Sequence, residues 1–174
     1  MSPEQIKALI RDIPDFPEPG IVFKDITPVL ASPPAFAAVV DFYAERLAAA
    51  NAEVILAIES RGFIFGAAVA RLMGLPMHLV RKQGKLPHLT VGIDYELEYG
   101  SDRLEIHREA LLPGRRYAVV DDLLATGGTA GATVRLVREH GGQVACCAFM
   151  IELGFLNGAQ RLGDCRVDSL LVLE

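Results

Sequence analysis

Two adjacent carboxylates, Asp121 and Asp122, are followed closely by the small-residue run Thr126–Thr129, which reads Thr-Gly-Gly-Thr. Small residues let backbone N–H groups converge without obstruction, and at a helix N-terminus such groups form a phosphate site. Ionised carboxylates accept hydrogen bonds from the neighbouring hydroxyl groups of a sugar. The stretch therefore predicts a site for a sugar phosphate, namely a ribose 5-phosphate unit.

The elements on either side must hold this stretch in place. Tyr117–Val120 is an apolar run that predicts a buried strand, and Ala130–Val137 has the apolar periodicity of a helix. The acid pair would then end the strand, and the glycines would open the helix. Each half also occurs alone, since acid pairs end strands in Walker-B-like sites, metal-dependent phosphatases and solvated termini, and Gly-Gly is often only a turn. The two halves in this order are much more specific.

Charged groups also follow two other predicted strands, Glu53–Ile58 and Pro76–Val80. The C-terminal ends of parallel strands are where open α/β sheets bind ligands, and arginine and lysine neutralise phosphates. These groups therefore predict a diphosphate site. The alternatives are a surface salt bridge between Arg61 and Glu59, and a merely solvated basic loop. The charged and polar residues are Glu59, Ser60 and Arg61 after the first strand, and Arg81, Lys82 and Lys85 after the second.

The segment Pro14–Pro28 contains four prolines, which exclude a long helix or a central strand. Phe16, Val22 and Phe23 nevertheless make it too apolar for a solvated linker. We expect a stiff, packed, irregular segment that covers core surface. The alternative is one wall of a binding pocket, in which Phe23 stacks on a planar ligand.

Strands that alternate with helices along the rest of the chain predict an α/β fold with a mainly parallel twisted sheet flanked by helices. Val91–Leu97 and Arg103–His107 alternate like the strands of a hairpin. A connection this long in a small domain predicts a flexible lid. The other expected elements are helices over Pro33–Ala49 and Gly62–Met73, and strands over Gln143–Ile151 and Asp168–Leu173.

Composition narrows the class of protein. The 174 residues are 51% hydrophobic, which predicts one globular domain, and the net charge of −5 argues against binding nucleic acid or an anionic membrane. An odd number of cysteines, two of them adjacent at Cys146 and Cys147, predicts reduced thiols and a cytoplasmic protein. We expect no signal peptide and no membrane-spanning segment.

Taken together, these segments resemble the adenine phosphoribosyltransferases, a branch of the type I phosphoribosyltransferase family. The acid pair and glycine loop are common to many phosphoribosyltransferases, whereas the other segments are typical of the adenine-specific branch. The resemblance covers nearly the whole chain. Its carriers are Phe16–Ile26, Glu59–Phe63, Arg81–Pro87, Leu97–Gly100 and Asp121–Thr129.

The resemblance implies a purine salvage reaction in which adenine and phosphoribosyl diphosphate give AMP and diphosphate with Mg²⁺. It implies a single domain over residues 1–174, with an N-terminal hood at 1–32 and a lid hairpin at 82–108, and a homodimer. Two alternatives stay open, a transferase for another purine base and a non-catalytic regulator that binds phosphoribosyl diphosphate. An acidic chain that retains Glu98 disfavours the regulator.

The resemblance also implies roles for individual residues. The 5′-phosphate would be held by Ala125, Thr126, Gly127, Gly128 and Thr129, and the ribose hydroxyls by Asp121 and Asp122. The diphosphate would meet Glu59, Ser60 and Arg61, in a turn with a cis peptide, together with Arg81, Lys82 and Lys85. Adenine would lie against Val22, Phe23 and Lys24, with Leu153 on its other face. Glu98, Tyr99 and Arg61 would serve catalysis, and Mg²⁺ would be bound mainly through the diphosphate.

Three positions depart from the family pattern. Lys24 stands where arginine is frequent, Glu59 where aspartate is also used, and His88 where glycine is common. None of these positions belongs to the predicted phosphate loop.

Overall fold

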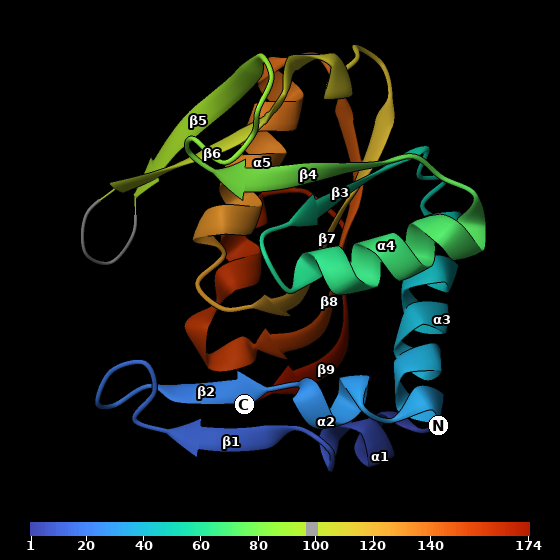
Figure 1. The fold of residues 1–174 in the computed structure, drawn as a ribbon, viewed down its shortest axis with the longest axis vertical. Coiled ribbons are helices and arrows are strands. Elements are labelled where there is room, and N and C mark those ends of the chain that lie inside the picture. The colour runs from blue at the N-terminus through green and yellow to red at the C-terminus, as the bar shows by residue number, and fades with distance from the viewer. Residues whose placement is uncertain (97–100) are drawn as a thin grey trace. The chain divides into compact units, whose positions relative to one another are not determined.

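The computed structural model describes residues 1–96 and 101–174 (Figure 1). Two compact units divide the chain, Met1–Phe42 and Tyr43–Glu174. The N-terminal unit carries the segment predicted to touch a base, and the C-terminal unit carries the predicted phosphate-binding groups. Helix α3 (Pro33–Ala49), whose predicted limits are confirmed, contains the boundary.

The N-terminal unit begins with a short capped helix, α1 (Pro3–Lys7), whose capping box joins Ser2 and Gln5. A two-stranded antiparallel sheet follows, made of β1 (Arg11–Pro14) and β2 (Val22–Asp25). Opposite charges face each other across it, and Lys24 Nζ lies 2.7 Å from Asp12 Oδ1. Such cross-strand pairs stabilise a sheet.

The prediction of a wholly irregular proline-rich segment is therefore wrong for its second half. Residues 22–25 form strand β2, and α2 (Thr27–Leu30) follows directly. The side chain of Asp25 accepts a hydrogen bond from the Thr27 backbone N–H at 2.9 Å, which turns the chain into this helix. Proline is tolerated here because Pro14 lies at the end of its strand and Pro28 in a first helical turn.

Seven strands form the sheet of the C-terminal unit, and in chain order they are β3 (Val54–Ile58), β4 (Met77–Lys82), β5 (Thr90–Glu96), β6 (Ser101–His107), β7 (Arg116–Leu124), β8 (Gln143–Leu153) and β9 (Val167–Leu173). Across the sheet their order is β5-β6-β4-β3-β7-β8-β9. The five strands from β4 to β9 are parallel, and the β5–β6 hairpin is added in antiparallel fashion. The predicted mainly parallel sheet and the predicted hairpin are confirmed.

Helices cover both faces of this sheet. Helix α4 (Gly62–Met73), again with its predicted limits, packs on β3, β4 and β7, and α5 (Gly128–Glu139) packs on the strands from β5 to β8. Within the described ranges, no helix has both the length and the apolarity needed to cross a bilayer. Three short 3-10 helices complete the unit, η1 (Arg108–Ala110), η2 (Gly154–Leu156) and η3 (Gly158–Leu162).

The core lies between these layers, and its largest cluster includes Leu56, Val119 and Phe149 on the sheet and Leu136 on α5. All five residues of β3 are buried, as expected for a parallel strand covered on both faces. Both adjacent cysteines on β8 are fully buried, and all three cysteines are free thiols.

Two strands extend further than the sequence pattern indicated. Strand β7 was expected to end at Val120 but continues to Leu124, so the acid pair lies within the strand and not beyond it. The reason is β8, which stays paired with β7 as far as Leu124, whereas the pairing of β3 with β7 ends at Val120. Strand β4 likewise continues through Arg81 and Lys82 because β6 pairs with both residues.

We predict that Gly66→Ala destabilises the fold. A methyl group at this position of α4 would lie 2.7 Å from the Ala57 Cβ of β3 and 3.1 Å from the Met77 sulfur. Overpacking of this kind costs about 1–3 kcal/mol. Urea unfolding measures the loss, and Ala67→Val on the exposed side of the same helix serves as control. Equal stability of Gly66→Ala and the native chain would contradict this packing.

Candidate functional site

The predicted phosphate-binding groups lie at one edge of the sheet in the C-terminal unit. They follow, or end, the parallel strands β3, β4 and β7, and these strands all deliver their C-terminal ends to the same edge. This is the position at which open α/β sheets bind ligands. The structure thus brings together three groups of residues that are up to 70 positions apart in the chain, from Glu59 to Thr129.

The acid pair is held in a largely buried environment. Asp122 is only 3% exposed, and its Oδ2 lies 3.0 Å from Nη2 of Arg61, at the end of β3. Asp121 Oδ1 accepts a hydrogen bond from the Asp122 backbone N–H at 2.9 Å. Burial raises the pKa of Asp122 while the Arg61 guanidinium lowers it, and the net shift is upward. Burial and the neighbouring Asp122 raise the pKa of Asp121 well above its usual range.

Tyr43 holds the backbone of the acid pair, a role that the sequence analysis did not assign. Its hydroxyl donates to the Asp121 carbonyl oxygen at 2.8 Å, and its ring lies 5.6 Å from that of Phe65. The side chain is fully buried, and burial raises the pKa of its hydroxyl, with a further increase from Asp122 and Asp121. The sequence gave it only as one residue of an apolar helix stripe.

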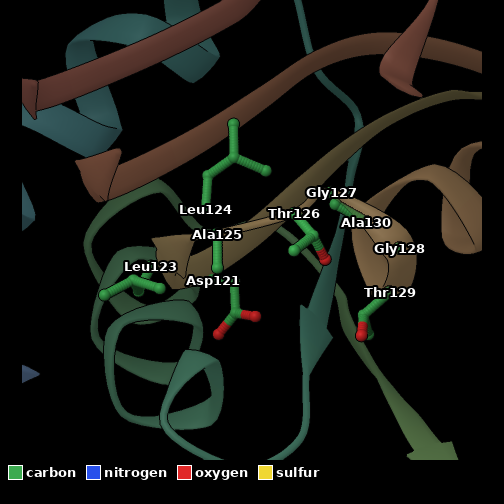
Figure 2. A pocket seen from close by; sticks show the side chains of 9 residues that line it. All are labelled: Asp121, Leu123, Leu124, Ala125, Thr126, Gly127, Gly128, Thr129 and Ala130. Carbon is green, nitrogen blue, oxygen red and sulfur yellow. The ribbon is translucent and has the colours of Figure 1, made fainter. Parts of the chain in front are cut away.

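The small-residue loop forms the start of helix α5. Gly127 is the N-cap with a φ of +78°, and it has no side chain to accept bonds from the first N–H groups of the helix. Those N–H groups have no acceptor within the helix itself. Figure 2 shows the loop lining a pocket that also exposes the carboxylate of Asp121 and the hydroxyls of Thr126 and Thr129. Uncapped N–H groups and hydroxyls make this pocket suited to an anion.

The pocket encloses about 100 Å³. One water molecule needs about 10–15 Å³ of such space, so a phosphate group has room. Its lining consists of Asp121, Leu123, Leu124, Ala125, Thr126, Gly127, Gly128, Thr129 and Ala130, which includes every residue predicted to hold the 5′-phosphate.

Gly158 is a second residue that the sequence analysis missed. A Cβ at this position of η3 would lie 2.1 Å from the Ala125 carbonyl oxygen, and a Cβ on Gly127 would lie 2.2 Å from the Gly158 oxygen. The two backbones therefore touch directly, and this contact shapes the loop from behind. The only local signal was a glycine after Asn157, which is typical of any turn.

The basic groups after β4 gather around the carboxylate of Glu59. Arg81 Nε lies 3.3 Å from Glu59 Oε2, Lys85 Nζ bonds Oε1, and the Lys82 backbone N–H donates to Oε2 at 3.1 Å. Burial raises the pKa of Glu59, but the bonds from Lys85, Lys82 and Arg81 together lower it below its ordinary value. Glu59 is thus ionised and orients the cations. The predicted cis peptide is present between Glu59 and Ser60.

The remaining predicted residues lie apart from these groups in the description. Val22, Phe23 and Lys24 are on β2 in the N-terminal unit, where the Phe23 ring packs edge-on against Phe16 with centroids 5.2 Å apart. Leu153 ends β8 in the C-terminal unit. Glu98 and Tyr99 lie outside the described residues. The joint base pocket and the two catalytic residues stay predictions.

Comparison with known proteins gives the family. Residues 27–164, most of the chain, match the phosphoribosyl transferase domain. The chain belongs to this family. The predicted resemblance is thereby confirmed, and the match spans both the acid pair and the glycine loop.

Relatives within the family are adenine phosphoribosyltransferases. The Anaeromyxobacter dehalogenans protein of that name is 52% identical over 168 residues, covering 97% of this chain and 98% of its own. The Thermoanaerobacter pseudethanolicus enzyme structure has a TM-score of 0.95 at 48% identity, covering 99% of this chain and 100% of its own. The Saccharomyces cerevisiae enzyme, solved with adenine and an imino-altritol bisphosphate, has a TM-score of 0.91 at 36% identity, covering 97% and 98%. The phosphoribosyltransferase fold extends over the whole chain.

We predict that Asp121→Asn makes the unliganded protein more stable at neutral pH. The pKa of Asp121 is raised in the folded state, so its contribution to stability is present at low pH and lost as the pH rises through that raised pKa. Asparagine does not ionise and keeps the acceptor oxygen. The melting temperature should be a few degrees higher at pH 7–8, since 1 kcal/mol corresponds to about 2–4 °C in a domain of this size.

The gain should shrink as the pH approaches about 4, the ordinary range of aspartate. Asp94→Asn removes an exposed carboxylate on the β5–β6 hairpin and should show no such gain. A lower melting temperature of Asp121→Asn at pH 7 would contradict the assigned electrostatics.

Proposed function

We propose that this protein is an adenine phosphoribosyltransferase, which transfers the phosphoribosyl group of 5-phosphoribosyl 1-diphosphate to adenine and releases AMP and diphosphate. The observation that carries the proposal is the acid pair of β7 beside the uncapped glycine loop of α5, in a chain similar over its whole length to enzymes of that name. The reaction belongs to purine salvage.

The substrate's constant part would bind to the C-terminal unit. The loop Ala125–Thr129 offers backbone N–H groups and two hydroxyls to the 5′-phosphate. Asp121 and Asp122 would accept hydrogen bonds from the ribose hydroxyls. Arg61 then has two functions, since it neutralises Asp122 and stands in the turn proposed to face the diphosphate. The leaving group would thus be close to the ribose-binding carboxylates.

Charge development favours this arrangement. Displacing diphosphate breaks the bond from C1′ to oxygen, and the oxygen keeps the electron pair, so positive charge builds on the ribose while negative charge builds on the leaving group. Carboxylates next to the ribose stabilise the first charge, and Arg81, Lys82 and Lys85 stabilise the second. Glu59 keeps these cations at the end of β4 before substrate arrives.

Adenine would be bound by Val22, Phe23 and Lys24 of β2, with Leu153 at its other ring face. An aromatic side chain provides a stacking surface for a purine. Phe23 is held by Phe16, and the Lys24 ammonium is occupied by Asp12. The Lys24 backbone therefore remains the part of this residue best suited to read the base, as the lysine in place of arginine already indicated.

The proton on adenine N9 must leave as N9 attacks C1′. We assign assistance to Glu98, either by accepting that proton or by holding a proton at N7, and Tyr99 would accompany it over the reaction centre. Both residues belong to the connection between β5 and β6. Excluding water at this point protects the activated sugar from hydrolysis.

Magnesium fits the donors that this site offers. Mg²⁺ prefers oxygen ligands and is usually bound by one or two carboxylates together with substrate phosphates and water. Among residues 1–96 and 101–174, no group of three His, Cys, Asp or Glu side chains could enclose an ion. Asp121 and Asp122 are the hard oxygen donors at the site, so the ion would be held mainly by the diphosphate. When bound, it neutralises the departing anion.

Two further properties are part of the proposal. Helix α4 exposes Ile64 and Leu72, at 40% and 56%, and such apolar side chains support a homodimer through this helix. Three free cysteines without a disulfide support a cytoplasmic location.

The decisive experiment compares bases. One stock of phosphoribosyl diphosphate with Mg²⁺ is offered to the protein with adenine, hypoxanthine or guanine, and AMP, IMP and GMP are measured. We expect AMP formation and little or no IMP or GMP. Preferential IMP or GMP formation would assign the enzyme to another purine, and no product with any base would indicate a binding protein without catalysis.

We predict that Glu98→Ala lowers kcat by about 100-fold or more, the usual range for losing general acid–base assistance. Binding of phosphoribosyl diphosphate, measured by calorimetry without base, should change little because Glu98 acts on the base. Glu109→Ala, at an exposed acid of η1, is the matched control and should retain full turnover. An unchanged kcat for Glu98→Ala would remove this residue from the mechanism.

A further inference from the structure

A chain of hydrogen bonds joins the β5–β6 hairpin to the proposed phosphate and diphosphate sites. Lys82 Nζ at the end of β4 lies 3.0 Å from Asp102 Oδ2 on β6. The same carboxylate oxygen accepts from the Tyr95 hydroxyl on β5 at 3.3 Å. The Tyr95 hydroxyl in turn is hydrogen-bonded to the side chain of Thr129, in the first turn of α5. The two ends of the chain are residues proposed to bind substrate.

The middle of this chain is fixed by its surroundings. Tyr95 is only 5% exposed, which leaves its hydroxyl few partners other than these two side chains. Asp102 is anchored at its second oxygen, because the Arg103 backbone N–H donates to Oδ1 at 2.8 Å. By contrast, the Lys82 side chain is 56% exposed. A long flexible side chain at that exposure has many conformations unless a partner selects one.

The direction of each bond follows from the chemistry of the groups. The hydrogen bond from Lys82 and that from the Arg103 backbone lower the pKa of Asp102, which is therefore an ionised acceptor. Burial raises the pKa of Tyr95, so its hydroxyl keeps its proton and donates it to Asp102. The Tyr95 oxygen can then accept the proton of the Thr129 hydroxyl.

We propose that Tyr95 and Asp102 are positioning residues for phosphoribosyl diphosphate, Tyr95 through the Thr129 hydroxyl and Asp102 through the Lys82 ammonium. The proposal rests on the proposed function, since it takes the phosphate to bind at Thr129 and the diphosphate near Lys82. Neither Tyr95 nor Asp102 needs to touch the substrate.

The bond pattern can adapt when phosphate binds. Thr129 has one hydroxyl proton, and a phosphate oxygen that replaces Tyr95 as acceptor takes that proton. Tyr95 can then turn its own proton from Asp102 to the Thr129 oxygen, while Asp102 keeps Lys82 and the Arg103 N–H. The 3.3 Å separation between Tyr95 and Asp102 marks this bond as the weakest of the chain and the one most easily exchanged. The Thr129 oxygen remains fixed in both states.

The functional consequence is preorganisation. A hydroxyl and an ammonium that are oriented before binding lose less conformational freedom when the ligand arrives, and the affinity rises accordingly. Chains of hydrogen bonds also strengthen one another. Substrate binding therefore depends on two side chains of the hairpin that lie behind the groups touching the ligand.

The test measures binding without a base, by calorimetry with phosphoribosyl diphosphate and with ribose 5-phosphate. Tyr95→Phe keeps the buried ring and removes only the hydroxyl, so it should weaken both ligands by about tenfold, equivalent to one hydrogen bond to a charged system. Asp102→Asn frees Lys82 and should weaken phosphoribosyl diphosphate more than ribose 5-phosphate. Asp94→Asn, an exposed acid on the same hairpin, should bind both ligands like the native protein.

A double-mutant cycle separates positioning from general damage. In a Thr129→Val background, Tyr95→Phe should cause no further loss, because its effect passes through the missing hydroxyl. The same loss in both backgrounds, or no loss in the native one, would overturn the proposal for Tyr95. Should Tyr95→Phe fail to fold, the cycle of Asp102→Asn with Lys82→Met tests the other arm in the same way. Because no base is present, an error in the assigned base specificity would not affect the result.

Discussion

Burial of the Asp122 carboxylate is the constraint on which the site depends. An ionised group that is almost fully removed from water requires a counter-charge, since an unpaired buried charge costs several kcal/mol. Arg61 provides it from the turn after β3, and it can do so because Gly62 lets α4 begin against β7. A Cβ on Gly62 would lie 2.7 Å from the Val120 carbonyl oxygen and 3.0 Å from Asp121 Oδ1. The acid pair, the arginine and the start of α4 therefore form one connected unit.

The same principle of direct backbone contact shapes the phosphate loop. Gly127 and Gly158 approach so closely that neither position has space for a side chain. The loop is held from behind by η3, while its N–H groups and hydroxyls face the pocket (Figure 2). A rigid loop of this kind binds an anion without reorganising, which favours affinity. The cations after β4 are held in a comparable way by Glu59, which orients them without itself being suited to bind a phosphate.

These features make substrate binding a property of several segments that are distant in sequence. The end of β3 supplies the arginine, the end of β4 the cations, β7 the acids and α5 the loop. The hairpin adds Tyr95 and Asp102, which connect two of these segments by hydrogen bonds. Constant parts of the substrate are thus recognised at one sheet edge, whereas the proposed recognition of adenine uses β2 and the end of β8.

The sequence by itself determined the class of fold, the limits of α3 and α4, the phosphate loop and the acid pair. These are local signals, because helix periodicity, the glycine run and adjacent carboxylates are all contained in short windows. Tertiary structure decided that β7 continues through the acids, that Arg61 pairs with Asp122, and that Tyr43 and Gly158 support the site. Each of these depends on a partner strand or a buried neighbour far away in the chain, and no short window of sequence contains that partner.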